Sequence, residues 1–252
     1  MKESDIRPQA LVDRYIALSE EDARTLFNKA SFARTSCVAC GGNSLRPEIE
    51  KYRFSYDRCV DCGTLFLNPR PELAAFEELY SRSKSSRYWA EVFFPAVAES
   101  RREAVFAPRV SDLRAKFESE LDSGLVAIDV GAGFGIFLEE LRKAFPATHA
   151  IAIEPSESLG KLCVEKGFQT ESMMAENAVH LSGAGDIVFC FEVLEHVQSP
   201  YDFLVSLRDL VRPGGHVYLT TLTADGFDLF TLGAQSFQIS PRTTSTFYQY
   251  PE

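Results

Sequence analysis

The chain has 252 residues, and its 26 basic and 36 acidic residues give a formal net charge of −10. At about 150 residues per domain, this length fits one large domain with a small appendage. The acidic balance argues against nucleic-acid binding, because a duplex DNA binder needs basic residues against the phosphates. No apolar run is long enough to span a membrane, and the first residues lack the apolar core of a signal peptide, so we expect a cytoplasmic protein.

Residues 1–31 are expected to form a polar helical segment. Beyond it lie two close cysteine pairs separated by eighteen residues: Cys37 with Cys40, and Cys59 with Cys62. Two residues between paired cysteines allow one tight turn to direct both sulfurs at a single ion, and two such turns supply four thiolates. The spacing therefore predicts a structural zinc site in a small ribbon over residues 32–68, with no open position for a catalytic water.

Residues 69–122 are expected to form a helical linker that covers the cleft of the main domain. The linker begins with the turn Asn68-Pro69-Arg70-Pro71, after which apolar residues recur at helical spacing: Leu73, Phe76, Leu79 and Tyr80. Tyr88 and Trp89 belong to this segment and are expected to be core residues rather than part of an acceptor pocket.

In residues 123–252, short apolar runs alternate with amphipathic stretches of about ten residues. The runs predict strands over residues 125–130, 149–153, 168–170, 187–191 and 216–220. The stretches between them predict helices over residues 136–144, 156–166 and 203–211, the last ending at Arg212-Pro213-Gly214-Gly215. This alternation is typical of an α/β fold with a doubly wound, Rossmann-like parallel sheet. Cys163 and Cys190 lie in apolar surroundings and are expected to be core residues.

A glycine-rich loop follows the first predicted strand: Asp129-Val130-Gly131-Ala132-Gly133-Phe134-Gly135. Ligands of parallel sheets bind at the carboxyl ends of the strands, where glycines allow a close approach to the backbone. A dinucleotide fingerprint would place its third glycine or alanine at Ile136, so a nicotinamide cofactor is disfavoured. Glu154 ends the second strand, where a carboxylate can accept the hydroxyl protons of a ribose.

Three stretches, taken together and in this order, resemble class I S-adenosylmethionine-dependent methyltransferases over about residues 125–226. The stretches are Ala127 to Gly135, Ile153 to Ser156, and Phe191 to Val197 with the later Leu210 to Gly215. The segment from Cys59 to Pro71 is similar to the zinc-ribbon heads of bacterial methyltransferases, including sugar C-methyltransferases and enzymes of surface-polysaccharide pathways.

The resemblance implies methyl transfer from S-adenosylmethionine to a small-molecule acceptor, with a nucleotide-linked sugar as one candidate. It implies that Gly131 and Gly133 approach the methionine moiety, that Glu154 binds the ribose and that Phe191 lies near the cofactor. The cofactor residues that it assigns are Asp129, Gly131, Ala132, Gly133, Gly135, Glu154 and Phe191.

An acceptor hydroxyl or acidic carbon must lose its proton, and histidine is the usual base near neutral pH. His196 follows the fourth predicted strand, and Glu195 beside it is placed to orient it or to contact the acceptor. The alternative is that this Glu-His pair only caps the next helix, because the pair also occurs in methyltransferases of many other substrates.

The family sheet has seven strands, whereas only about thirty residues follow the fifth predicted strand here. We therefore expect an incomplete, C-terminally truncated sheet whose fifth strand has an uncovered edge. Degenerate codons for Pro241 to Glu252 can be read one frame over as Pro-His-His-Leu-Asn-Phe-Leu-Ser-Val-Ser-Gly, which resembles the continuation found in relatives. This leads to the hypothesis of a frameshift, with an unusual short tail as the alternative.

Two hypotheses of function follow. The first is a methyltransferase with a structural zinc ribbon. The second is a catalytically silent methyltransferase domain whose ribbon acts as a binding module, which the missing strands favour and the intact cofactor residues oppose. The sequence leaves open the acceptor, the methylated atom and the oligomeric state.

Overall fold

The structure is a computed structural model, and it describes residues 3–28, 31–52, 54–72, 74–75, 78, 83–121, 124–239 and 245–249. The chain forms two compact units. The sheet unit consists of Met1–Tyr15, Arg87–Phe191 and Leu204–Leu219, and the ribbon unit consists of Ile16–Ser86, Glu192–Phe203 and Thr220–Glu252. The units thus interleave along the chain, whereas the predicted domain boundaries are continuous ranges.

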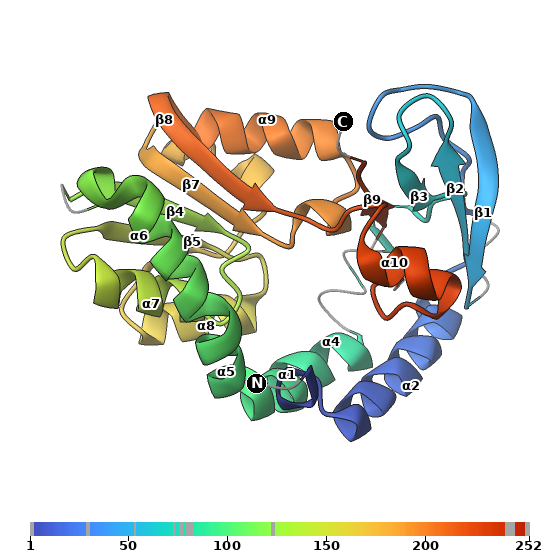
Figure 1. The fold of residues 1–252 in the computed structure, drawn as a ribbon, viewed down its shortest axis with the longest axis horizontal. Helices are drawn as coiled ribbons and strands as arrows, with labels where there is room; N and C mark the ends of the chain where they lie inside the picture. Colours follow the sequence, from blue (N-terminus) through green and yellow to red (C-terminus); the bar gives the residue numbers. More distant parts are fainter. Residues whose placement is uncertain are drawn as a thin grey trace. The chain divides into compact units, whose positions relative to one another are not determined.

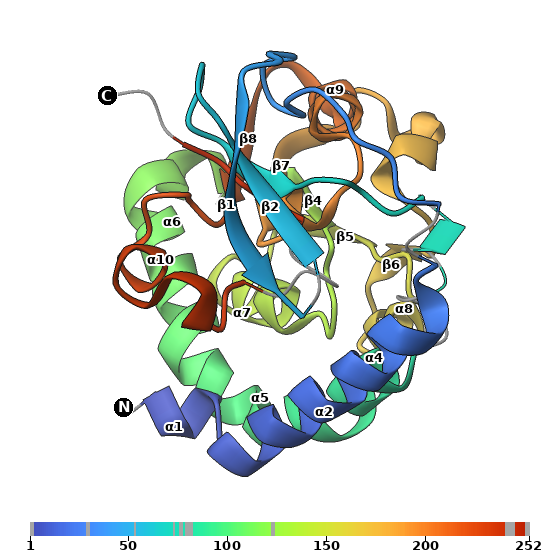
Figure 2. The same cartoon turned by 90° about the vertical axis from the view of Figure 1, so that its right-hand side faces the viewer.

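The sheet unit is built on five strands in the order β6-β5-β4-β7-β8 (Figures 1 and 2). Their bounds are β4 Val126–Val130, β5 His149–Ile153, β6 Gln169–Glu171, β7 Gly185–Phe191 and β8 Val211–Thr220. β4 pairs in parallel with β5 and with β7, and β5 pairs in parallel with β6. The predicted doubly wound parallel sheet is confirmed, with its first strand at the centre.

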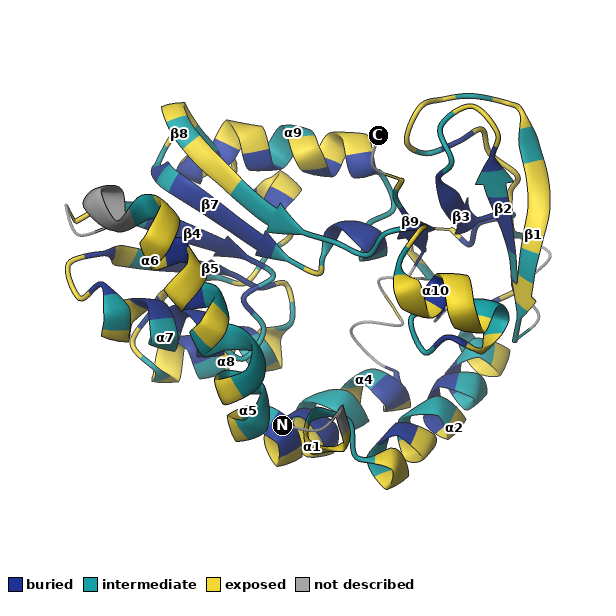
Figure 3. Cartoon of the chain, in the orientation of Figure 1, coloured by how far each residue is buried: buried dark blue, intermediate teal, exposed yellow. Residues whose placement is uncertain are grey.

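Helices follow the strands of the sheet unit. Their bounds are α7 Ile136–Ala144 and α8 Glu157–Glu165, with short 3₁₀ turns at Ala175–Asn177 (η4), Val179–Leu181 (η5) and Leu194–His196 (η6), and then α9 Pro200–Leu210. α7 buries Ile136, Phe137, Leu138 and Leu141, and the last three join a core with residues of β4, β5 and β7. The central strands are accordingly buried, whereas β8 is partly exposed (Figure 3).

The predicted helical linker is a long helical run interrupted by two π-helical turns. Its parts are α4 Lys84–Tyr88, η2 Trp89–Phe93, α5 Phe94–Arg101, η3 Arg102–Phe106 and α6 Ala107–Leu121. Val110 and Leu113 of α6 join the core of the sheet unit. Trp89 stacks on Phe93 at 4.4 Å between ring centroids, but Tyr88 and Trp89 are only half-buried, so the expected core position is not reached. Of the predicted helix over Leu73 to Tyr80, the residues Leu73, Phe76, Leu79 and Tyr80 lie outside the described residues.

The fifth strand differs from its prediction. β8 begins at Val211 and runs through the Pro-Gly-Gly stretch that was predicted as the stop of the preceding helix. Among the described residues β8 is an edge strand of this sheet.

The ribbon unit contains a second sheet with the order β1-β2-β3-β9, in which β1–β2, β2–β3 and β3–β9 are antiparallel pairs (Figure 1). The strands are β1 Leu45–Lys51, β2 Phe54–Cys59, β3 Leu65–Leu67 and β9 Thr246–Phe247. β1 and β2 form the hairpin that joins the two cysteine pairs. Near the end of the chain, Thr246 pairs with Phe66 and Phe247 with Leu65, so β9 joins this sheet from a distant part of the sequence.

The remaining helices are α1 Glu3–Ile6, α2 Gln9–Leu26, α10 Phe227–Leu232 and the 3₁₀ turn η7 Gly233–Gln235. The N-terminal segment is helical, as predicted. The core of the ribbon unit gathers Phe27, Phe54, Tyr56, Leu65, Leu67, Ala224, Leu229, Ile239 and Phe247. None of the described helices is long and apolar enough to cross a membrane.

Candidate functional site

The glycine-rich loop between β4 and α7 bends back onto the end of β5. The N–H of Gly131 donates to the carbonyl of Ile153 at 2.8 Å. Gly131, Gly133 and Gly135 have φ values of 78°, 55° and 68°. These lie in the left-handed region that residues with a Cβ rarely adopt, so the loop requires glycine at all three positions.

Glu154 follows β5 and binds the loop directly. Its two carboxylate oxygens accept hydrogen bonds from the N–H of Gly133 at 2.8 Å and the N–H of Ser156 at 2.9 Å. The side chain is 7% exposed, and burial raises the pKa of this carboxyl although both hydrogen bonds oppose the shift. An ionised carboxylate has about four lone-pair sites, so two remain for the hydroxyls of a ligand.

Asp129 is the second buried carboxyl group at this end of the sheet. Only 3% of the residue is exposed, and its pKa is raised to about 7. Burial is the main cause, the charge of Glu154 adds to it, and the guanidinium of Arg109 opposes it. Burial disfavours the ionised form of both carboxyl groups, so a positively charged group at this end of the sheet would favour their ionisation.

Arg109 of α6 is a site residue that the sequence did not reveal. Its guanidinium carbon lies 4.1 Å from the ring centroid of Phe191 at the end of β7, within cation–π range. The same guanidinium influences Asp129. Arg109 therefore joins the predicted Asp129 and Phe191 at the carboxyl end of the sheet. No motif marks this arginine, because it reaches the site only through the packing of α6.

Two further contacts hold the tip of the glycine loop at Phe134. The amino group of Lys166 donates to the Phe134 carbonyl at 2.7 Å and also contacts Glu139. The Phe134 ring stacks on Phe94 of α5 with centroids 3.9 Å apart and planes 3° from parallel. The helical linker thus contributes directly to the position of the loop.

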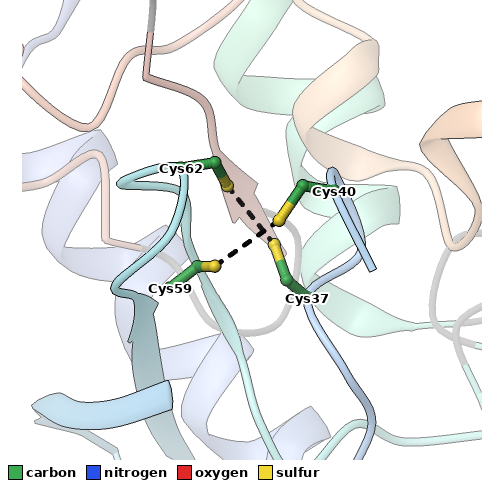
Figure 4. Close-up of side chains that lie close together, drawn as sticks. All are labelled: Cys37, Cys40, Cys59 and Cys62. Atoms are coloured by element: carbon green, nitrogen blue, oxygen red, sulfur yellow. Dashed lines mark hydrogen bonds between the residues drawn. The ribbon is translucent and has the colours of Figure 1, made fainter. Parts of the chain in front are cut away.

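The four paired cysteines lie together in the ribbon unit, and their sulfur atoms are all within 4.8 Å of one another (Figure 4). The sulfurs of Cys37 and Cys62 are 3.6 Å apart, as are those of Cys40 and Cys59. Zn–S bonds of about 2.3 Å place the sulfurs of a tetrahedral site about 3.8 Å apart. The donor set and its spacing therefore fit a tetrahedral zinc ion.

Each cysteine pair lies on a tight turn of the same form. Gly41 donates its N–H to the Cys37 carbonyl at 2.8 Å, and Gly63 donates to the Cys59 carbonyl at 2.9 Å. Both glycines have a positive φ, 75° and 74°, which explains why a glycine follows each pair. The predicted arrangement of two matching turns is confirmed. Cys163 and Cys190 are buried outside this cluster, as predicted.

The segment after β7 carries the predicted Glu195 and His196 and belongs to the ribbon unit. Glu195 is 1% exposed, and its carboxylate accepts a hydrogen bond from the Thr221 hydroxyl at 2.8 Å. Burial raises its pKa; His196 opposes this and Glu192 adds to it. Glu192 has φ 56°, an uncommon backbone conformation for a residue with a side chain, and such conformations cluster at functional sites.

The predicted residues thus form two groups. The cofactor candidates Asp129, Gly131, Ala132, Gly133, Gly135, Glu154 and Phe191 belong to the sheet unit, and the cysteines with Glu195 and His196 belong to the ribbon unit. The strand order, the glycine loop and the acid after the second strand define a Rossmann-like domain for a nucleoside-containing cofactor.

Comparison with known proteins shows to which family this Rossmann-like domain belongs. The family model described as a methyltransferase domain matches residues 99–247, more than half of the chain. The chain therefore belongs to the methyltransferase domain family, and S-adenosylmethionine-dependent methylation is the chemistry that this membership supports.

Curated relatives and solved structures also match. A ubiquinone biosynthesis O-methyltransferase of Vibrio parahaemolyticus is 31% identical over 161 residues, which are 60% of this chain and 62% of that protein. A protein of the same name from Escherichia coli is 30% identical over 165 residues, 62% of each chain. This chain thus spans about 62% of the length of these relatives.

Two solved structures give a TM-score of 0.44 at 18% identity. They are a sugar N-methyltransferase from Streptoalloteichus, with 52% of this chain and 54% of that chain covered, and a methyltransferase from Archaeoglobus fulgidus, with 62% and 66% covered.

Proposed function

We propose that this chain transfers the methyl group of S-adenosylmethionine to a small-molecule acceptor. The observation that carries the proposal is the hydrogen bond between Gly133 and Glu154. It joins the glycine loop to the carboxylate that is expected to bind the ribose. Family membership supports the cofactor, and the acidic charge and absence of a basic tract disfavour a nucleic-acid acceptor.

The proposed cofactor contacts follow from the positions of the side chains. Gly131 and Gly133 leave room for the methionine moiety to approach the backbone, and Glu154 has free lone pairs for the ribose hydroxyls. Ala132 and Gly135 maintain the loop, while Asp129 meets the positive end of the cofactor. Arg109 over Phe191 closes this end of the sheet unit.

When bound, the sulfonium supplies an already activated methyl group, so the protein mainly positions the acceptor and accepts its proton. We propose His196 as the base, with Glu195 as the residue that orients its loop. His196→Ala should then lower turnover by about 10²- to 10⁴-fold with cofactor affinity unchanged. A loss below tenfold would contradict this role.

We propose a nucleotide-linked sugar or a polysaccharide precursor as the acceptor, because the residues from Cys59 to Pro71 are similar to the ribbon of sugar C-methyltransferases. A sugar C-methyltransferase would methylate carbon. The curated relatives are named O-methyltransferases, which supports oxygen as the alternative methylated atom. Two acceptor panels, nucleotide sugars and phenolic quinone precursors, discriminate between these possibilities.

The four cysteines are proposed to hold one structural zinc ion. Their thiolates would complete its tetrahedron, so the ion would stabilise the ribbon and leave the chemistry to other residues. Less than about half an equivalent of metal in anaerobically purified protein would count against this site.

The first experiment is a calorimetric titration of the chain with S-adenosylmethionine and S-adenosylhomocysteine, together with a thermal melt. Micromolar binding is expected. A cooperative melt without binding would refute the proposal and favour the silent domain with a binding ribbon.

A further inference from the structure

The segment 192–198, here called the post-β7 loop, is held mainly through its backbone carbonyls. The Leu194 carbonyl accepts a hydrogen bond from the Tyr248 hydroxyl at 3.1 Å. The Glu195 carbonyl accepts one from the Ser245 N–H at 2.8 Å. The Val197 carbonyl lies 3.4 Å from Nη2 of Arg70. The three carbonyls that surround His196 in the sequence are therefore all bonded within the ribbon unit.

The groups that donate these bonds are themselves fixed to the cysteine ribbon. The Ser245 carbonyl accepts the N–H of Leu67, and the next two residues pair with β3 as β9. Arg70 exchanges two backbone hydrogen bonds, of 2.8 and 2.9 Å, with Ala33 just before the first cysteine pair. A continuous series of hydrogen bonds thus connects the ribbon strands to the post-β7 loop.

Gln198 strengthens the same connection from the loop side. Its side-chain oxygen accepts a hydrogen bond from Nη2 of Arg70 at 3.1 Å, and its side-chain nitrogen donates to the Pro71 carbonyl at 3.2 Å. The amide of Gln198 therefore pairs with the segment that follows β3 in both directions. Such reciprocal bonding restricts the register of the loop more than a single contact would.

Burying the charged side chain of Arg70 is energetically unfavourable, which argues against a merely structural role. It is 3% exposed, and its Nε and Nη1 atoms have no hydrogen-bond partner among the residues that the structure describes. Within the described part of the chain, its Nη2 contacts three neutral oxygens: the Val197 carbonyl, the Gln198 amide and the Ser245 hydroxyl. A buried cation without a carboxylate destabilises a fold relative to an apolar residue of similar size. Its presence here favours a role in specifying geometry over a role in stability.

We infer that Arg70, Ser245 and Tyr248 form a clamp by which the cysteine ribbon positions the post-β7 loop for methyl transfer. The ribbon is then part of the catalytic apparatus rather than a module for binding a partner. Arg70, Ser245 and Tyr248 are positioning residues, because they contact the loop backbone and act through His196 and Glu195. This inference rests on the proposed function.

Two clamp variants test this inference. Tyr248→Phe removes one hydroxyl from the Leu194 carbonyl, with the exposed Tyr201→Phe as its control. Arg70→Met replaces the buried cation with an apolar chain, with the exposed Arg46→Met as its control. Because small misplacements of reacting groups reduce rates strongly, we expect both clamp variants to lower kcat at least tenfold. Cofactor Kd should stay within twofold, because the cofactor residues belong to the sheet unit.

Two measurements separate positioning from structural damage. The chain has four histidines, so the ring Cε1–H signal of His196 can be assigned by NMR, and we expect it to shift in both clamp variants and in neither control. Hydrogen exchange at the amides of His196 and Ser245 should quicken. Arg70→Met should unfold at the same temperature as the wild type or higher, whereas a structural role predicts a lower one.

The inference is overturned if kcat, the His196 signal and the exchange rates of both clamp variants match those of the controls. It is also overturned if Arg70→Met is destabilised while Tyr248→Phe changes nothing. A wild-type chain that binds no cofactor would contradict the proposed function separately, and the NMR and exchange measurements would still decide whether the clamp exists.

Discussion

Replacing Glu154 with glutamine tests the cofactor site with little change in shape. The carboxylate accepts one hydrogen bond on each oxygen, from Gly133 at 2.8 Å and from Ser156 at 2.9 Å. A glutamine keeps one accepting oxygen and turns an NH₂ group toward the other backbone N–H. The substitution therefore removes one charge-assisted bond to the loop and the negative charge offered to a ribose.

The two effects have different magnitudes. A hydrogen bond to a charged group contributes about 1.5–3 kcal/mol. Losing the bond to the loop lowers the free energy of unfolding. Part of this loss is offset, because a neutral amide does not pay the desolvation cost of a buried carboxylate, the cost that raises the pKa of Glu154. We expect the free energy of unfolding to fall by about 1 kcal/mol. The lost charge toward the ribose should weaken binding by the full 1.5–3 kcal/mol, which is about 10- to 150-fold in Kd.

Calorimetry with S-adenosylhomocysteine and urea unfolding measure both quantities on the same preparation. The exposed Glu157→Gln is the matched control, because it makes the same chemical change at the first residue of α8, three positions after Glu154. A Kd for Glu154→Gln within threefold of this control would refute the assigned role of the carboxylate, whatever the change in stability.

Three further results are expected. Cys59→Ser should reduce bound zinc from about one equivalent to less than half, whereas Cys163→Ser should retain it, as measured by elemental analysis. The pKa of Asp129 in the fold, about 7, lies above its ordinary 3.8, so between these values the unfolded chain binds fewer protons than the folded chain. The free energy of unfolding should therefore fall as the pH rises through this window, with a contribution from Asp129 of up to about 1.4 kcal/mol per pH unit, and Asp129→Asn should reduce the slope by that contribution. Arg109→Met removes the opposing cation, so the upper end of this slope should move to higher pH in urea titrations; an unchanged profile would show that the two groups do not interact.

Much of the sheet unit could be predicted because its signals are local. Buried parallel strands are short apolar runs, and the glycines after β4 mark the loop wherever the rest of the chain lies. β8 was predicted too short because Pro213 and Gly214 are usually found in turns. β1 was missed because Pro47, Glu48 and Glu50 give it no apolar alternation.

The site could be predicted only as far as it is continuous in sequence. The glycine loop, Glu154 and the cysteine pairs are motifs, whereas Arg109 enters the site by the packing of α6. β9 consists of two residues that form a strand only against the distant β3, and no local pattern marks it. The assignment of the post-β7 loop to the ribbon unit likewise depends on pairings between distant segments.

The charges at the carboxyl end of β4 also predict a difference in affinity between the cofactor and its demethylated product. Asp129 and Glu154 resist ionisation because they are buried, and Arg109 offsets the charge of Asp129 incompletely, so a positively charged ligand relieves the site. In the proposed function Asp129 faces the positive end of the cofactor. Methyl transfer would convert the sulfonium into a neutral thioether, so the attraction to an ionised Asp129 would be lost with the charge. S-adenosylmethionine should therefore bind more tightly than S-adenosylhomocysteine, by a ratio that grows from pH 6 to pH 8 as Asp129 ionises. The ratio should not vary with pH in Asp129→Asn, and a wild-type ratio that is equally flat would show that this carboxyl group does not contact the positive end of the cofactor.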